Sequence, residues 1–104
     1  MEIPKSFKLF GQKITVEMRK ALFYEKEKQN GLCLPQENKI LIQENTKKHP
    51  HAQDNIEQTF YHEFTHFMLY KLGYDELSED EVFVDQVASC IHQLHNSMEH
   101  YKKN

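Results

Sequence analysis

The sequence predicts an α+β fold, with a small sheet in the first half of the chain and helices in the second. From Phe7 to Glu44 apolar and polar residues alternate, which is the two-residue period of half-buried strands. From Ile56 onward the apolar residues recur every three to four positions, as in an amphipathic helix. The 104 residues, 38% of them hydrophobic, are expected to form one domain, residues 1–104, around a single core.

The first half is expected to form a three-stranded antiparallel sheet. Turn-forming residues separate its strands at Gly11-Gln12, at Asn30-Gly31 and at Pro35-Gln36-Glu37-Asn38. The pair Asn30-Gly31 favours a tight hairpin turn, because both residues tolerate a positive φ angle. The segment from Lys20 to Lys28 is compatible either with a strand or with a short helix.

Two helices are expected after the polar loop that ends near Asn55. The first has its apolar residues on one side, and Gly73 follows it as a C-terminal cap would. The second is expected to begin at Ser78, a good N-cap, with acidic residues in its first turn where the helix dipole favours anions. The expected apolar stripe of this second helix consists of Phe83, Val87, Cys90, Ile91, Leu94 and Met98.

Composition and charge exclude several classes of protein. The formal net charge is -3, and the 13 Lys and Arg residues are scattered, so nucleic acid is not an expected partner. No stretch resembles a signal peptide or a membrane span, which predicts a cytoplasmic protein with no membrane partner. Cys33 and Cys90 form no Cys-x-x-Cys pair, so a zinc knuckle is excluded, and reduced thiols are the default over a disulfide.

One short motif carries most of the chemical information in the chain: His62-Glu63-Phe64-Thr65-His66, within the first expected helix. Histidines four residues apart lie on one face of an α-helix, so their ring nitrogens can converge on one metal ion. Glu63 is then held beside that ion, where it can accept a proton from water as a general base. The motif predicts one Zn²⁺ per chain, with His62 and His66 as ligands and Glu63 as the catalytic residue.

Catalytic zinc usually takes three protein ligands, so a third donor is expected downstream of His66. The histidine that metzincins have six residues further on is excluded, because that position is Leu72. On the second expected helix, Glu81 and Asp85 lie one turn apart on the same face. Glu81 is expected to bind the metal, while Asp85 accepts the second N–H of a ligating histidine.

Glu81 is also placed to cap the second helix. Ser78 and Glu81 have the spacing of a capping box, in which the glutamate binds the backbone at the helix start instead of a metal. In that case Asp85 becomes the third ligand. The remaining candidates are Glu79, Asp80 and His92.

A His-Glu-x-x-His motif followed by a helix with Glu-x-x-x-Asp resembles the pattern of the gluzincin metallopeptidases. From Phe7 to Leu94 the chain is similar to the small zincin-like proteins of phages and mobile elements, which are related to the ImmA/IrrE metallopeptidases. The resemblance implies a minimal zincin-like domain with a zinc-bearing helix followed by a glutamate-bearing helix. It assigns zinc binding to His62, His66 and Glu81, the general base to Glu63, and support of a ligating histidine to Asp85.

The other histidines and tyrosines are less informative. A solvated loop is the expected place of His49 and His51, and a solvated or interfacial position that of His92 and His95. Three tyrosines are candidates for stabilising an oxyanion, although packing is the more common role of this residue type: Tyr61, Tyr70 and Tyr74.

Together these features predict a zinc-dependent peptidase that hydrolyses a peptide bond in a cytoplasmic protein. The strand Lys39–Gln43 is expected to hold an extended substrate by strand addition. A catalytically inactive zincin-like binding or regulatory protein is one alternative, and a small interaction protein with an accidental motif is another. A metal-dependent nuclease is a third, suggested by the stretch Leu72-Gly73-Tyr74-Asp75.

Overall fold

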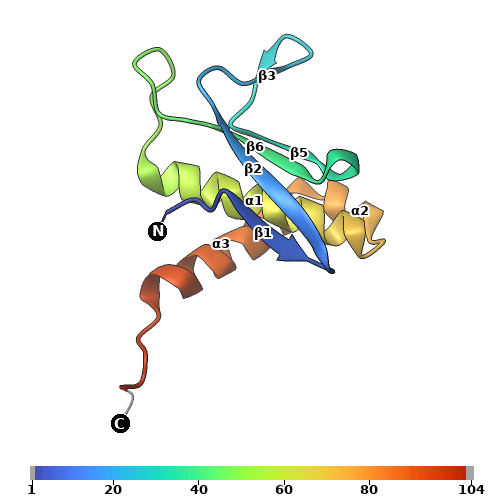
Figure 1. Ribbon diagram of the computed structural model, residues 1–104, viewed down its shortest axis with the longest axis vertical. Coiled ribbons are helices and arrows are strands. Elements are labelled where there is room, and N and C mark those ends of the chain that lie inside the picture. The colour runs from blue at the N-terminus through green and yellow to red at the C-terminus, as the bar shows by residue number, and fades with distance from the viewer. Residues whose placement is uncertain (1, 103–104) are drawn as a thin grey trace.

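The computed structural model describes residues 2–102, and its mixed sheet and helices confirm the α+β class (Figure 1). One sheet contains four strands in the spatial order β1 (Ser6–Leu9), β2 (Gln12–Arg19), β6 (Lys39–Gln43) and β5 (Gly31–Leu34). A separate small hairpin is formed by β3 (Phe23–Tyr24) and β4 (Glu27–Lys28). The helices are η1 (Pro35–Glu37), α1 (Gln53–Lys71), α2 (Asp75–Glu79) and α3 (Glu81–Ser97). No helix within residues 2–102 combines the length and the apolar character that crossing a bilayer requires.

The sheet is four-stranded and mixed, so the prediction of three antiparallel strands is wrong. Strands β2 and β6 run parallel, with Val16 opposite Ile40, whereas the β1–β2 and β5–β6 pairs are antiparallel. The alternation of apolar residues fixes which face of a strand is buried, but it contains no information on strand direction. The direction of β5 and β6 depends on the residues between β2 and β5, which form the β3–β4 hairpin. After this hairpin the chain runs back along the sheet as β5, so that β6 is parallel to β2.

Tight two-residue hairpin turns lie at Phe10-Gly11, between β1 and β2, and at Glu25-Lys26, between β3 and β4, and the prediction of such a turn at Asn30-Gly31 is wrong. Both Glu25 and Lys26 have positive φ angles, 51° and 69°, as a two-residue turn between antiparallel strands requires. Gly31 instead begins β5. The ambiguous segment from Lys20 to Lys28 is therefore a short hairpin and contains no helix.

Strand β6 lies in the interior of the sheet, between β2 and β5. Both of its edges are therefore paired, which rules out the predicted strand addition at Lys39–Gln43. Strand β5 is instead the edge of the sheet on this side, and its outer backbone edge carries no further strand among the described residues.

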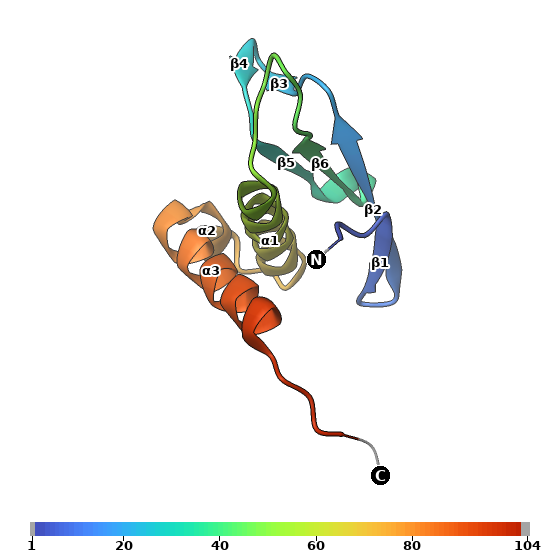
Figure 2. The ribbon, with the colours of Figure 1, turned by 90° about the vertical axis from the view of Figure 1, so that its left-hand side faces the viewer.

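Helix α1 lies between the sheet and α3, and so it is covered on both sides (Figure 2). Its sheet-facing residues Ile56, Phe60 and Phe67 are buried, as the helical period predicts. Tyr61 is also buried, because His92 and His95 of α3 pack against it on the side that the sheet leaves open. The buried core cluster consists of Ile14, Val16, Ile40, Ile42, Ile56, Phe60, Tyr61, Phe67 and Ala88.

Helix α3 begins later than predicted, and its buried face only partly matches the predicted stripe. Its N-cap is Asp80, whose carboxylate accepts a hydrogen bond from the Phe83 amide at 3.1 Å, whereas Ser78 lies within α2. Val84 and Ala88 are the fully buried residues of α3, while Leu94 of the predicted stripe is 61% exposed. The predicted stripe includes Ile91, which packs against the core, but it omits Val84 and Ala88.

Candidate metal centre

A close approach between β5 and α1 sets the position of the glutamate in the motif. A Cβ atom on Gly31 would lie 2.6 Å from Thr59 Cγ2 and 2.8 Å from Glu63 Cγ, distances that real side chains do not tolerate. Glycine at the start of β5 therefore lets the strand rest directly on α1. The Asn30-Gly31 pair serves this contact rather than a turn.

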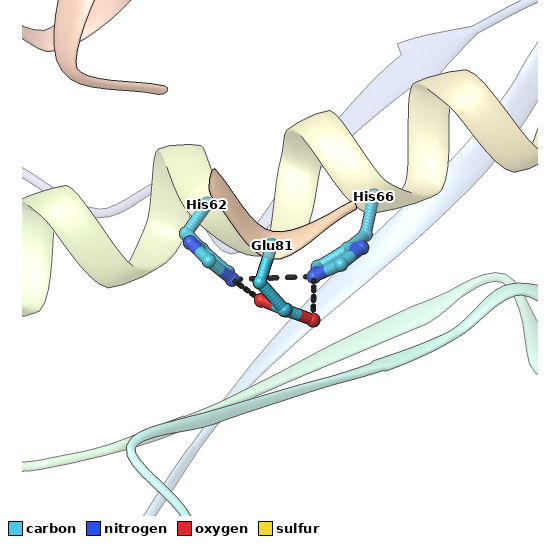
Figure 3. A group of neighbouring side chains, drawn as sticks. All are labelled: His62, His66 and Glu81. Carbon is cyan, nitrogen blue, oxygen red and sulfur yellow. Dashed lines mark hydrogen bonds and ion pairs between the residues drawn. The ribbon is translucent and has the colours of Figure 1, made fainter. Parts of the chain in front are cut away.

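The structure brings together the three side chains predicted to bind the metal. His62 and His66 lie on one face of α1 and point toward Glu81, the first residue of α3 (Figure 3). The two Nε2 atoms are 3.2 Å apart, and they lie 3.0 and 3.2 Å from the two Glu81 oxygens. Ligand atoms from all three residues fall within 4.8 Å of one another, as binding to one ion requires.

The other ring nitrogen of each histidine faces an oxygen acceptor. His62 Nδ1 lies 3.2 Å from Asp85 Oδ1, and His66 Nδ1 lies 2.5 Å from the backbone carbonyl of Ser78. Both Nδ1 atoms are therefore donors, and in the neutral rings both Nε2 lone pairs point to the same place. Two lone pairs and a carboxylate facing one another repel unless a cation lies between them. The donor set therefore fits a bound Zn²⁺.

The alternative role for Glu81 as a cap is not realised in the structure. Asp80 caps α3, so the backbone at the helix start does not need Glu81. The side chain of Glu81 is 68% exposed, which leaves the cluster accessible to an ion from solvent. Neither Glu79 nor His92, the other candidates for a third ligand, belongs to the group that converges with His62 and His66. Glu79 lies on the rim of the cleft, and the ring nitrogens of His92 face Glu57 and Gln58.

Glu63 lies behind the histidines, buried between α1 and β5. Only 7% of it is exposed, and burial raises the pKa of its carboxyl to about 7, while nearby His62 lowers it and Glu81 raises it. A carboxyl with a pKa near neutrality can both accept and release a proton at physiological pH.

A cleft of about 940 Å³ opens over the cluster, between β5 on one side and α2 and the start of α3 on the other. His62, Glu63, His66 and Glu81 line it together. Five of its lining residues are acidic, and none of the described residues in its wall is Lys or Arg. The acidic residues are Glu63, Asp75, Glu79, Glu81 and Asp85.

Several cleft residues had no sequence signal or were given another role. Ser78 was predicted as a helix cap, yet its carbonyl holds His66 and its hydroxyl donates to the His66 carbonyl at 3.1 Å. Gly31 and Cys33 line the cleft from β5 and were not predicted to do so. Of the candidate tyrosines, Tyr70 lines the cleft, Tyr61 is buried and bonded to His95, and Tyr74 is 56% exposed.

Comparison with known proteins gives this chain no relative. It matches no family model, no curated protein and no solved structure. The chemistry of the centre is therefore inferred from its own side chains.

The two cysteines are expected to react with alkylating agents at very different rates. Both are free; Cys90 is exposed, whereas burial and nearby Glu63 raise the pKa of Cys33 to about 12. At pH 8 the thiolate fraction of Cys33 is then on the order of a thousand-fold below that of a thiol with the ordinary value. Iodoacetamide labelling followed by peptide mass spectrometry should find Cys90 modified first. Equal labelling rates in the folded protein would contradict the burial of Cys33.

Proposed function

We propose that the protein is a zinc-dependent metallopeptidase. In this proposal His62, His66 and Glu81 hold one zinc ion, Glu63 is the general base, and Asp85 orients His62. The observation that carries the proposal is the convergence of two imidazole lone pairs and one carboxylate beside a buried glutamate, at the base of an open cleft.

The chemistry divides between the metal and the chain. Bound zinc supplies Lewis acidity, which polarises a carbonyl and makes water a stronger acid. Glu63 would accept the proton of the attacking water and later deliver it to the departing amine, so that one carboxyl serves both halves of the hydrolysis. Its burial keeps bulk water from competing for that proton.

The edge of the sheet suggests how a substrate binds. Strand β5 lines the cleft through Gly31, Leu32 and Cys33, and it is the edge strand on that side of the sheet. An extended peptide could pair with the outer edge of β5, where no further strand lies among the described residues, and run across the histidines. This assigns to β5 the substrate contact first predicted for Lys39–Gln43.

The gluzincin resemblance agrees with this assignment of roles. Glu81 and Asp85 provide the Glu-x-x-x-Asp pattern on α3, and they face the two histidines of α1. By analogy with ImmA/IrrE-like zincins, we propose a specific cytoplasmic protein as the target. The nuclease alternative is less favoured, since the described cleft wall has five acidic residues and no Lys or Arg to attract a phosphate backbone.

Zinc content gives the first test of this proposal. Wild-type protein is expected to hold about one zinc ion per chain by inductively coupled plasma mass spectrometry, and His66→Ala to hold little, because two ligands bind zinc weakly. His100→Ala, in the exposed segment after α3, is the matched control and should keep its zinc. Zinc-loaded wild type should also generate new N-termini in a proteome-derived peptide library. A protein that takes up no zinc after reconstitution would overturn the proposal.

A further inference from the structure

Hydrogen bonds continue from the candidate metal centre into the interface between α1 and α3. Asp85 Oδ1, which accepts from His62, also lies 3.4 Å from Gln58 Nε2. Gln58 is on α1, one turn before His62, and its Nε2 also donates to Ser89 Oγ of α3 at 3.0 Å. Gln58 therefore connects the two helices next to the carboxylate that orients His62.

The orientation of the Gln58 amide is fixed by Asp85, whose carboxylate can only accept a hydrogen bond. His92 Nδ1 lies 3.0 Å from Gln58 Oε1, so the oxygen end of the amide faces His92 and the nitrogen end faces Asp85. The opposite orientation would place the amide oxygen against Asp85 Oδ1, so that two acceptors face each other. Asp85 and Ser89 therefore contact the nitrogen end of Gln58, and its oxygen end faces His92.

His92 is held in turn by a buried carboxylate. Its Nε2 lies 3.1 Å from Glu57 Oε1, and only 3% of Glu57 is exposed. Burial raises the pKa of Glu57, but hydrogen bonds, His92 first among them, lower it by more, so Glu57 is charged at neutral pH. A charged acceptor beside the ring fixes His92 firmly in place.

We infer that Gln58 is a positioning residue of the metal centre, held against α3 by Ser89 and acting on His62 through Asp85. This inference rests on the proposed zinc site. Groups that orient a ligating histidine set its basicity and direction, and their loss typically weakens metal binding about 10- to 100-fold. Gln58 is one hydrogen bond further from His62 than Asp85 is, so its loss is expected to weaken zinc binding less.

The test compares zinc affinities across a double-mutant cycle of Gln58→Met and Asp85→Ala, measured by competition with a chromophoric chelator. Methionine keeps the length and the helix propensity of glutamine but cannot donate to Asp85. Gln58→Met is expected to weaken zinc binding about 2- to 10-fold, less than the loss of a group that contacts a ligating histidine directly, because Gln58 acts through Asp85. Gln86→Met, at an exposed position on α3, is the matched control and should bind zinc as wild type does.

The cycle separates positioning from a general structural role. If Gln58 acts through Asp85, Gln58→Met has no further effect on zinc affinity once Asp85 is alanine. An equal loss in both backgrounds, or no loss in either, would overturn the inference while leaving the zinc site of the wild type intact. A wild type that binds no zinc would overturn both the inference and the proposed function. Far-UV circular dichroism verifies the fold of each variant, and Gln58→Ala gives a second measurement of the same bond.

Discussion

Glu63→Gln is expected to lower the rate of peptide hydrolysis about 100- to 10,000-fold, the range that general acid–base catalysis contributes. The amide has the shape of the carboxyl but cannot take a proton from water. Zinc content should stay at the wild-type level, because Glu63 is not among the three converging ligand residues. The measurement is the number of new N-termini generated in the peptide library at equal concentrations of zinc-loaded protein.

Stability provides the control for this variant. Burial opposes the charged form of Glu63, so a neutral amide at this position should melt at a temperature no lower than that of the wild type. Glu79→Gln, on the exposed rim of the same cleft, is the matched change and should alter the rate little. Undiminished cleavage by a folded, zinc-bearing Glu63→Gln protein would show that Glu63 is not the base. Absence of cleavage by zinc-loaded wild type would favour a zinc-binding regulatory protein.

Gly31→Ala is expected to cost about 1–3 kcal/mol of folding free energy, the usual penalty for inserting a methyl group into a packed contact. The new Cβ would meet Thr59 Cγ2 at 2.6 Å and Glu63 Cγ at 2.8 Å, so either the strand or the helix must move. For a chain of this size each kcal/mol lowers the melting temperature by about 4–8 °C. Hydrolysis should fall as well, because the displaced residue is the proposed base. Calorimetry and the cleavage assay together measure the two effects.

A second substitution tests whether the collision is the cause. Thr59→Ser removes Cγ2 alone, so it should restore part of the stability of Gly31→Ala while changing the wild type little. Failure of Thr59→Ser to restore any stability would mean that the contact between β5 and α1 is looser than the structure shows.

The helical half of the fold was predictable because its signals are local. The period of Ile56, Phe60 and Phe67 identifies the helix, and four-residue spacing alone places His62 and His66 on one face. Glu81 was a candidate from its position after the motif, and the structure brings it to the two histidines. Whether these residues bind zinc stays a prediction.

The sheet was predicted less well, because strand order depends on contacts distant in sequence. Val16 and Ile40 belong to strands with the same alternating pattern whether they pair parallel or antiparallel. Asn30-Gly31 has a turn signature, yet its glycine is required by a helix whose sequence begins more than twenty residues later. A local pattern cannot distinguish these two uses of glycine.

Of the two groups that orient the histidines, one could be predicted from the sequence and the other could not. Asp85 has a side chain with an obvious role, so it could be proposed from the sequence. The acceptor for His66 is a backbone carbonyl, which every residue type carries, so nothing in the sequence marks Ser78 for that role. Its position depends on the path of the chain from α2 into α3.

The three proposed ligands come from two helices, α1 and α3, so zinc affinity depends on how those helices pack together. Zinc binding and the attachment of α3 to α1 must favour each other to the same extent, because the coupling between two equilibria is reciprocal. A partner that pulled α3 away would weaken zinc binding. Conversely, a rise in free zinc would hold α3 in place. Metal supply and helix docking would then form one equilibrium, so that a change in docking alone would alter how much zinc the proposed centre holds.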